Sequence, residues 1–96
     1  MLMIQEIKNK LHDAIGDLQS RYPIDKLAVF GSATRNDFTP ESDIDIMVEF
    51  DGEIGWEFFD LNDELEKLFE RKVDLVTREA IKPHYWEYIK NDVQYV

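Results

Sequence analysis

The most constraining feature of this sequence is a short apolar segment that opens with two aspartates two positions apart. Its residues alternate in character, which predicts a β-strand over Asp43–Phe50. In a strand, one face would carry Asp43, Asp45, Met47 and Glu49, and the other Ile44, Ile46, Val48 and Phe50. The second face predicts a buried surface. The first needs an explanation, because carboxylates buried without partners are costly.

Two further apolar runs predict neighbouring strands. Lys26–Phe30 is typical of a buried strand, and it ends at Gly31-Ser32, a tight change of direction where backbone approaches a ligand closely. Lys72–Thr77 predicts a third strand that carries another aspartate, Asp74, among apolar neighbours. If the third strand lies beside the second, Asp74 faces the same place as the first two aspartates.

Helical periodicity surrounds these strands. Residues 2–20 carry apolar side chains at three- and four-residue steps, and Pro23 then disfavours helical geometry in the residue before it. Residues 56–70 predict a second helix, and Pro83 suits the first position of a last helix running to about residue 91. A turn of helix is also expected over residues 33–37. The second helix is expected to contribute three aromatic residues to the hydrophobic core, Trp56, Phe58 and Phe59.

The order helix, strand, strand, helix, strand, helix predicts an α/β (α+β) fold with a small mixed β-sheet flanked by helices. A chain of 96 residues fits one such domain, spanning 1–96, and no more. An enzyme of this size has no separate substrate domain. We therefore expect it either to use a minimal site or to complete its site with a partner.

Charge and composition limit the partners. The formal net charge is −10, from 21 acidic against 11 basic residues, and such a surface repels nucleic-acid phosphates. We expect no direct nucleic-acid binding, and instead a basic protein partner or an anionic ligand brought in with metal ions. The chain has no cysteines and no segment approaching the ~18–20 apolar residues of a membrane span. The expected location is the cytoplasm, without membrane attachment.

Three aspartates that converge repel one another, and divalent cations relieve that repulsion. Ligation by oxygen alone suits Mg²⁺, and carboxylates bridging two metal ions about 3.5–4 Å apart are typical of phosphoryl or nucleotidyl transfer. Gly31 and Ser32 would offer backbone N–H groups and a hydroxyl to phosphate oxygens. Arg35, one turn further on, would contact the same phosphates.

The pattern Gly31-Ser32, ten residues, Asp43-Ile44-Asp45 resembles the signature of the DNA polymerase β-like nucleotidyltransferase superfamily. The wider stretch, FGSATRNDFTPESDIDIMVEF followed by KVDLVT, resembles the minimal nucleotidyltransferase branch, the MntA-type antitoxins paired with HEPN-domain ribonuclease toxins. The likeness extends over nearly the whole chain. One departure is Asn36, which stands where relatives tend to have glycine, and which also tolerates left-handed backbone.

The resemblance implies roles for the motif residues. Asp43 and Asp45 would bind the two Mg²⁺ ions that accompany ATP, and Asp74 would ligate the catalytic metal and help activate the incoming hydroxyl. Gly31 and Ser32 would hold the β- and γ-phosphates, with Arg35 nearby. The implied reaction transfers AMP from ATP to a tyrosine of the HEPN toxin, releasing pyrophosphate and neutralising the toxin.

Other readings of the same residues remain open. Aspartates beside loops are often caps or turn residues. This explanation fits Asp45 and Asp74 less well, because both lie inside apolar strands. His84, Tyr85, Trp86 and Tyr88 are expected to pack or to face a partner. As a function, a non-catalytic antitoxin that blocks its toxin sterically is one alternative. A small-molecule nucleotidyltransferase acting on an aminoglycoside-like hydroxyl is another, although such enzymes usually carry an added helical domain.

Overall fold

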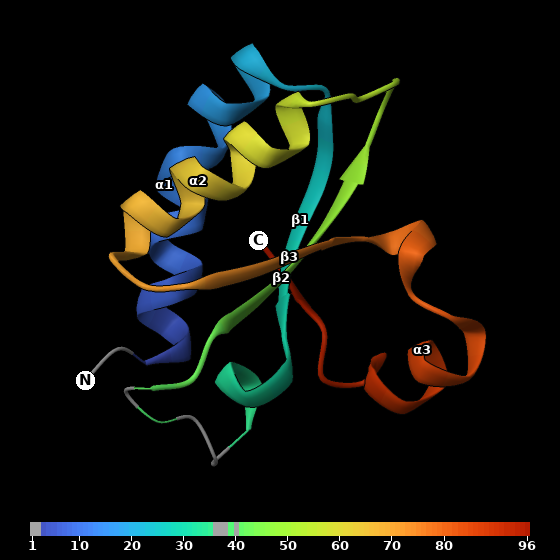
Figure 1. Ribbon diagram of the computed structural model, residues 1–96. Coiled ribbons are helices and arrows are strands. Elements are labelled where there is room, and N and C mark those ends of the chain that lie inside the picture. The colour runs from blue at the N-terminus through green and yellow to red at the C-terminus, as the bar shows by residue number, and fades with distance from the viewer. Residues whose placement is uncertain (1–2, 36–38, 40) are drawn as a thin grey trace.

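A four-stranded mixed β-sheet packed between helices organises residues 3–35, 39 and 41–96, which are the residues described by this computed structural model (Figure 1). In chain order its elements are α1 (Ile4–Arg21), β1 (Ile24–Phe30), the 3₁₀ turn η1 (Gly31–Thr34), β2 (Ile44–Phe50), α2 (Glu57–Phe69), β3 (Val73–Thr77), the 3₁₀ turn η2 (Arg78–Ala80), α3 (Pro83–Ile89) and β4 (Gln94–Tyr95). The α+β class and the mixed sheet predicted from the sequence are confirmed.

Element boundaries differ from the predicted ones by one to three residues at most ends. β1 begins at Ile24 rather than Lys26, because the side chain of Ile24 is buried and the strand passes a register shift at Asp25 before it continues. The helical turn expected over residues 33–37 is found as η1, which ends at Thr34. Asn36, Asp37 and Pro40, which the sequence places in this connection, lie outside the described residues.

The sheet has the strand order β3-β2-β1-β4. β1 pairs antiparallel with both β2 and β4, whereas β2 and β3 run parallel. A parallel pair requires a crossover, and α2 supplies it. This topology sets two registers that matter for the site: Phe30 lies opposite Asp45, and Asp45 lies opposite Asp74.

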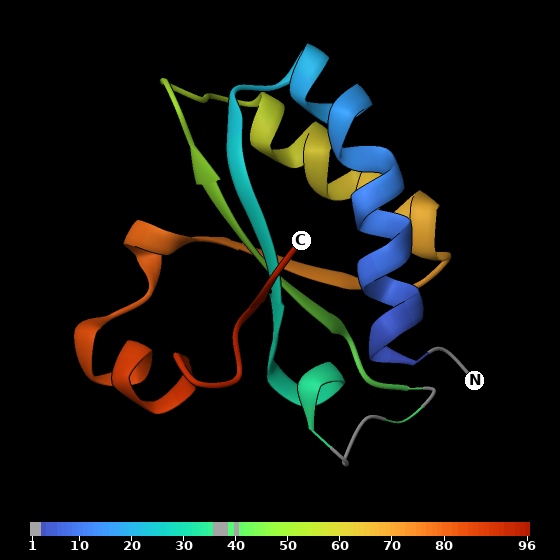
Figure 2. The ribbon, with the colours of Figure 1, turned by 180° about the vertical axis from the view of Figure 1, so that it is seen from behind.

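The alternation of β2 separates two apolar clusters, one on each face of the sheet. Ile44, Ile46 and Val48 join the larger cluster, which α1 and α2 cover on one side of the sheet. Met47 points to the other face and packs in a smaller cluster with Ala28, Phe30, Ile81 and Ile89, near α3. Figures 1 and 2 show α1 and α2 together on one side of the strands and α3 on the other.

The prediction that Trp56 and Phe59 belong to the core is wrong. Trp56 precedes α2 and is 84% exposed, and Phe59 is 58% exposed. The helix buries the row that contains Leu61 and Leu65, and Phe59 lies on the far side of the helix from Leu61. Phe58 is partly buried and does pack against the larger cluster.

Within the described ranges, no helix combines the length and apolar character needed to cross a membrane. The longest, α1, alternates buried residues such as Ile7 and Leu11 with exposed polar ones. It is therefore a surface helix of the fold, packed on the sheet through one face.

Candidate active site

Gly31 turns the chain at the end of β1 with a left-handed φ of +73°. A Cβ atom at this position would lie 2.0 Å from Oδ2 of Asp45, which no real side chain tolerates. Glycine is thus required here twice, once by the backbone and once by the carboxylate packed against it. The hydroxyl of Thr34 donates to the Gly31 carbonyl at 2.7 Å and closes the turn.

The turn places a backbone donor against the same carboxylate. The backbone N–H of Ser32 favours the charged form of Asp45 and lowers its pKa, and the N–H of Arg35 donates to the Ser32 carbonyl at 3.1 Å. Gly31, Ser32 and Asp45, which are separated by a connection in the sequence, therefore meet at one end of the β1–β2 pair. Their meeting was predicted from the motif spacing.

Asp45 is the electrostatic centre of this group. Burial raises the pKa of its carboxyl group to about 6, and the negative charges of Asp74 and Asp43 add to the increase. The Arg35 guanidinium and the Ser32 N–H act in the opposite direction without cancelling it. Negative charge at Asp45 is thus incompletely compensated by the protein, which favours a bound cation.

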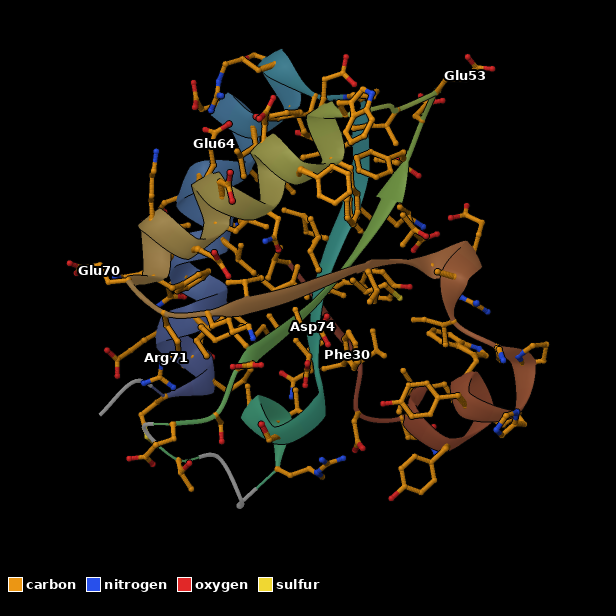
Figure 3. All side chains as sticks on the ribbon, in the orientation of Figure 1. Phe30, Glu53, Glu64, Glu70, Arg71 and Asp74 are labelled. Carbon is orange, nitrogen blue, oxygen red and sulfur yellow. The ribbon has the colours of Figure 1, made fainter. Side chains whose placement is uncertain are left out.

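The other two aspartates approach Asp45 differently. Asp74 is its direct partner across the parallel β2–β3 ladder, and its side chain is exposed. Asp43 comes just before β2 and is also exposed, but its charge is felt at Asp45. Figure 3 shows Asp74 on the strand that crosses in front of β2, above the η1 turn.

Arg71 is a positioning residue that the sequence did not suggest. It lies just before β3, and its Nη1 donates to the carbonyls of Thr39 at 3.3 Å and Ser42 at 3.4 Å. The N–H of Ile44 also donates to the Lys72 carbonyl at 3.1 Å. These bonds fix the segment leading into Asp43 against the start of β3. An arginine next to a turn carries no signal for such a role in the sequence alone.

Arg35, the third predicted phosphate contact, lies beside Asp45 at the surface of the site. Its side chain is about 40% exposed, and its Nη1 lies 4.0 Å from Oδ2 of Asp92 in the segment after α3. It is close enough to Asp45 to lower the pKa of that carboxyl group. An ion pair this long and this exposed contributes little to stability.

A cleft of about 420 Å³ opens beside the aspartates. Asp45 and Asp74 form one wall, and the rest is lined by Phe30, Val76, Ala80, Ile81, Lys82, His84 and Tyr85. Its floor is mostly apolar, and the polar groups of Lys82, His84 and Tyr85 come from the segment that opens α3. The sequence had suggested only packing or partner contacts for His84 and Tyr85, so their place beside the aspartates was not anticipated.

The carboxylates of this site suit a Mg²⁺ ion that is held jointly by the protein and by substrate phosphates. Among the described residues, no three His, Cys, Asp or Glu side chains form a group that would hold a metal ion unaided. Mg²⁺ in nucleotide enzymes is usually held by one or two carboxylates together with substrate phosphates, rather than by a cage of protein ligands. Asp45 and Asp74, paired in register with uncompensated charge, match that requirement.

Comparison with known proteins gives consistent results. Residues 11–96 match the nucleotidyltransferase domain family. A relative from Methanocaldococcus jannaschii, assigned as a protein adenylyltransferase, is 43% identical over 98 residues and covers 100% of both chains. MntA of Thermococcus cleftensis, named a protein adenylyltransferase, is 34% identical over 98 residues, covering 100% of this chain and 98% of that one.

Solved structures share the fold. One of a chain assigned as a minimal nucleotidyltransferase superposes with a TM-score of 0.76 at 24% identity, over 99% of this chain and 95% of the other. A second, the MNT antitoxin complex with a tri-AMPylated HEPN toxin from Shewanella oneidensis, gives a TM-score of 0.66 at 21% identity, over 97% of this chain and 71% of that chain.

The chain therefore belongs to the nucleotidyltransferase family. Its full-length relatives place it among the MntA-type protein adenylyltransferases, as the sequence motif had predicted. Membership of this family implies a nucleoside triphosphate as substrate, which for adenylyl transfer is ATP.

Proposed function

We propose that this chain is an antitoxin that transfers AMP from ATP, with Mg²⁺, to a tyrosine of a HEPN-domain ribonuclease toxin and thereby neutralises it. One observation carries the proposal: Asp45 is packed against Gly31 on one side and registered with Asp74 on the other. A nucleotide-holding turn and two acidic groups thus share one end of the sheet. The alternative reading of these aspartates as caps or turn residues accounts for neither contact.

In this mechanism the residues of the chain bind, orient and accept a proton. Gly31 and Ser32 hold the β- and γ-phosphates, assisted by Arg35. Asp43, Asp45 and Asp74 are the residues that would hold two Mg²⁺ ions, which neutralise triphosphate charge and polarise the α-phosphate when bound. Asp74 faces the acceptor and takes the proton of its hydroxyl group as the oxygen attacks the α-phosphorus. The bond from that phosphorus to the bridging oxygen breaks, and pyrophosphate leaves.

The exposure of Asp74 supports an acceptor that is a protein. Asp74 lies on β3, an edge strand of the sheet, and its side chain is open to solvent. The cleft beside it has only about 420 Å³ and mostly apolar walls, which suits one flat side chain delivered from outside. The net charge of −10 favours a partner that is locally basic, as an RNA-binding toxin must be.

Transfer of label from α-labelled ATP to a HEPN-domain toxin tests the proposal. With Mg²⁺ the wild-type chain should label the toxin, and Asp43→Asn with Asp45→Asn should reduce labelling roughly a thousandfold, since metal-assisted charge stabilisation supplies several kcal/mol. Asp13→Asn, which changes an exposed carboxylate of α1, is the matched control and should label normally. Equal labelling by the double variant would refute the mechanism.

The same variants separate the alternatives. A non-catalytic antitoxin would protect cells equally well with or without Asp43 and Asp45, whereas an enzyme would bind the toxin but no longer protect. A small-molecule nucleotidyltransferase would adenylylate an aminoglycoside-like compound without any partner protein. No contact within the described residues favours either alternative over protein adenylylation.

A further inference from the structure

An aromatic patch stands on the surface where α2 begins. We define it as Trp56 and Phe59, which are 84% and 58% exposed and whose rings lie 5.7 Å apart. Phe58 continues the row inward, with its ring 5.7 Å from Phe59 and 6.4 Å from Phe50. Because Phe50 and Phe58 pack against the larger apolar cluster, the patch is the outer end of a row anchored in the core.

Acidic residues surround the aromatic patch. From Asp51 to Asp63 the chain carries five acidic residues and no lysine, arginine or histidine. Asp60 and Asp63 follow Trp56 and Phe59 by four residues each, so they share one face of α2 with the patch. Within residues 3–35, 39 and 41–96, no ion pair neutralises either of these two aspartates.

The aromatic patch and the acidic residues beside it indicate what kind of molecule would bind at this surface. Large adjacent apolar side chains left in water, ringed by uncompensated charge of one sign, are typical of a protein-binding surface. The complementary surface presents apolar side chains flanked by lysine or arginine. A nucleic acid is disfavoured because its phosphates meet carboxylates, and a second copy of this chain is disfavoured because it brings the same acidic rim.

We propose that the aromatic patch and its acidic rim dock the acceptor protein through an apolar surface flanked by basic residues. This rests on the proposed function, because it assigns the patch to the protein that receives AMP. The patch lies beyond Phe50 at the end of β2, whereas Asp45 lies near its start, which separates the two by roughly 17 Å along the strand. In Figure 3, Glu53, in the loop before α2, lies well away from Asp74.

The distance between the aromatic patch and the aspartates indicates how large the acceptor must be and which kinetic constant the patch affects. Only an acceptor that spans such a distance reaches the patch and the aspartates at once, which excludes a small-molecule acceptor and fits a protein. Contacts remote from the reacting atoms are made equally in the ground state and the transition state. Their loss raises KM for the acceptor and leaves kcat unchanged.

The test uses Trp56→Ala with Phe59→Ala and, as a matched control, Met3→Ala. Met3 is an apolar residue that is also 58% exposed, and it lies at the start of α1. Calorimetric titration of the HEPN protein without ATP measures binding alone, and transfer from ATP gives kcat and KM. The double variant should raise Kd and KM at least tenfold with kcat within twofold of wild type, while the control changes neither.

A second double variant tests the two aspartates of the acidic rim. Asp60→Lys with Asp63→Lys should weaken binding several-fold, and wild-type binding should weaken as salt is raised, because the rim acts through partly exposed charges. The aromatic double variant should keep the circular dichroism spectrum of the wild type, since both side chains are largely in solvent.

Three results would overturn the docking surface. Unchanged Kd in the aromatic double variant would do so, and so would a fall in kcat with KM unchanged. A wild-type dimer that the double variant converts to a monomer in gel filtration would assign the patch to self-association instead. If no variant, including wild type, transfers AMP but binding still depends on Trp56, the docking surface stands and the proposed reaction fails.

Discussion

Glu64 and Asp45 are carboxylates on opposite sides of the sheet, and their surroundings move their pKa values in opposite directions. Glu64 accepts two bonds of 2.7 Å from the Arg21 guanidinium and one from the Tyr22 hydroxyl, so its pKa is lowered. Asp45 is half-buried beside Asp74 and Asp43, and its pKa is raised to about 6.

The difference separates a carboxylate that joins two helices from the one to which we assign a functional role. Arg21 ends α1 and Glu64 lies in α2, so their pairing joins the two helices that cover the sheet. At Asp45 the Arg35 guanidinium lowers the pKa without cancelling the effects of burial and of the neighbouring aspartates. A carboxylate whose charge is incompletely compensated is a candidate for binding a ligand that brings its own positive charge, as the proposed function requires.

Replacing Gly31 should have the largest effect, because this residue supports the functional carboxylate directly. In Gly31→Ala the new Cβ meets Oδ2 of Asp45 and the backbone is left-handed, so the carboxylate or the turn must move. A misplacement of about 1 Å costs roughly a hundredfold in rate, and we expect AMP transfer to fall by about that factor.

Gly16→Ala is the matched control for this substitution. Gly16 lies in α1 with nothing within 4 Å of an added Cβ, so alanine there should raise stability by about 0.5–1 kcal/mol through helix propensity. Thermal unfolding measures the stability of both variants, and labelling assays measure their AMP transfer. Wild-type transfer rates in Gly31→Ala would show that the contact with Asp45 has no catalytic role.

After the loss of activity in Gly31→Ala, the next largest effect should be a change in the pH dependence of stability in Asp45→Asn. The folded pKa of Asp45, about 6, lies above its ordinary value of 3.8, so the folded state binds the proton more tightly than the unfolded state. This contribution is complete below about pH 4 and is lost as pH rises through about 6. Asp45→Asn should therefore match wild type near pH 4 and exceed it by roughly 2 kcal/mol at pH 7.5 without metal.

Urea unfolding at both pH values measures this difference. Adding Mg²⁺ at pH 7.5 should stabilise the wild type and leave Asp45→Asn unchanged, because the variant lacks the charge that a cation relieves. A difference between the two proteins that is the same at pH 4 and pH 7.5 would contradict the raised pKa.

Glu64→Gln should show the smallest effect and the opposite slope. The lowered pKa of Glu64 means that its contribution is present above its ordinary value and is lost as pH falls. The pair is partly exposed, so we expect the variant to lose only a few degrees in Tm at pH 7 and to approach wild type below about pH 4. Its AMP transfer should stay normal, and a loss of transfer would remove the distinction between the two carboxylates.

Much of this arrangement could be predicted from the sequence, because periodicity and motif spacing are local. The alternation over Asp43–Phe50 correctly separated Ile46, in the larger cluster, from Met47, in the smaller one. Two apolar strands that each carry an aspartate led to the expectation that Asp74 faces the same place as Asp45 if the strands are neighbours, and the structure pairs the two residues.

Other features depend on how elements pack, which no local pattern encodes. The apolar character of Trp56 and Phe59 suggested burial, but α2 is covered on one side only. The bonds from Arg71 to the segment before Asp43 join residues about thirty positions apart. The cleft wall contributed by Tyr85 arises because α3 returns beside the aspartates after the chain has left β3.

The parallel pairing of β2 with β3 makes the two contacts of Asp45 depend on different parts of the fold. Gly31 and Asp45 come together through neighbouring antiparallel strands, whereas Asp74 reaches Asp45 through the crossover that α2 makes. A chain with α2 detached would keep the contact between Gly31 and Asp45 and lose the pairing of Asp45 with Asp74. Under the proposed function it would lack the residue that receives the proton, so AMP transfer would report whether the fold is complete.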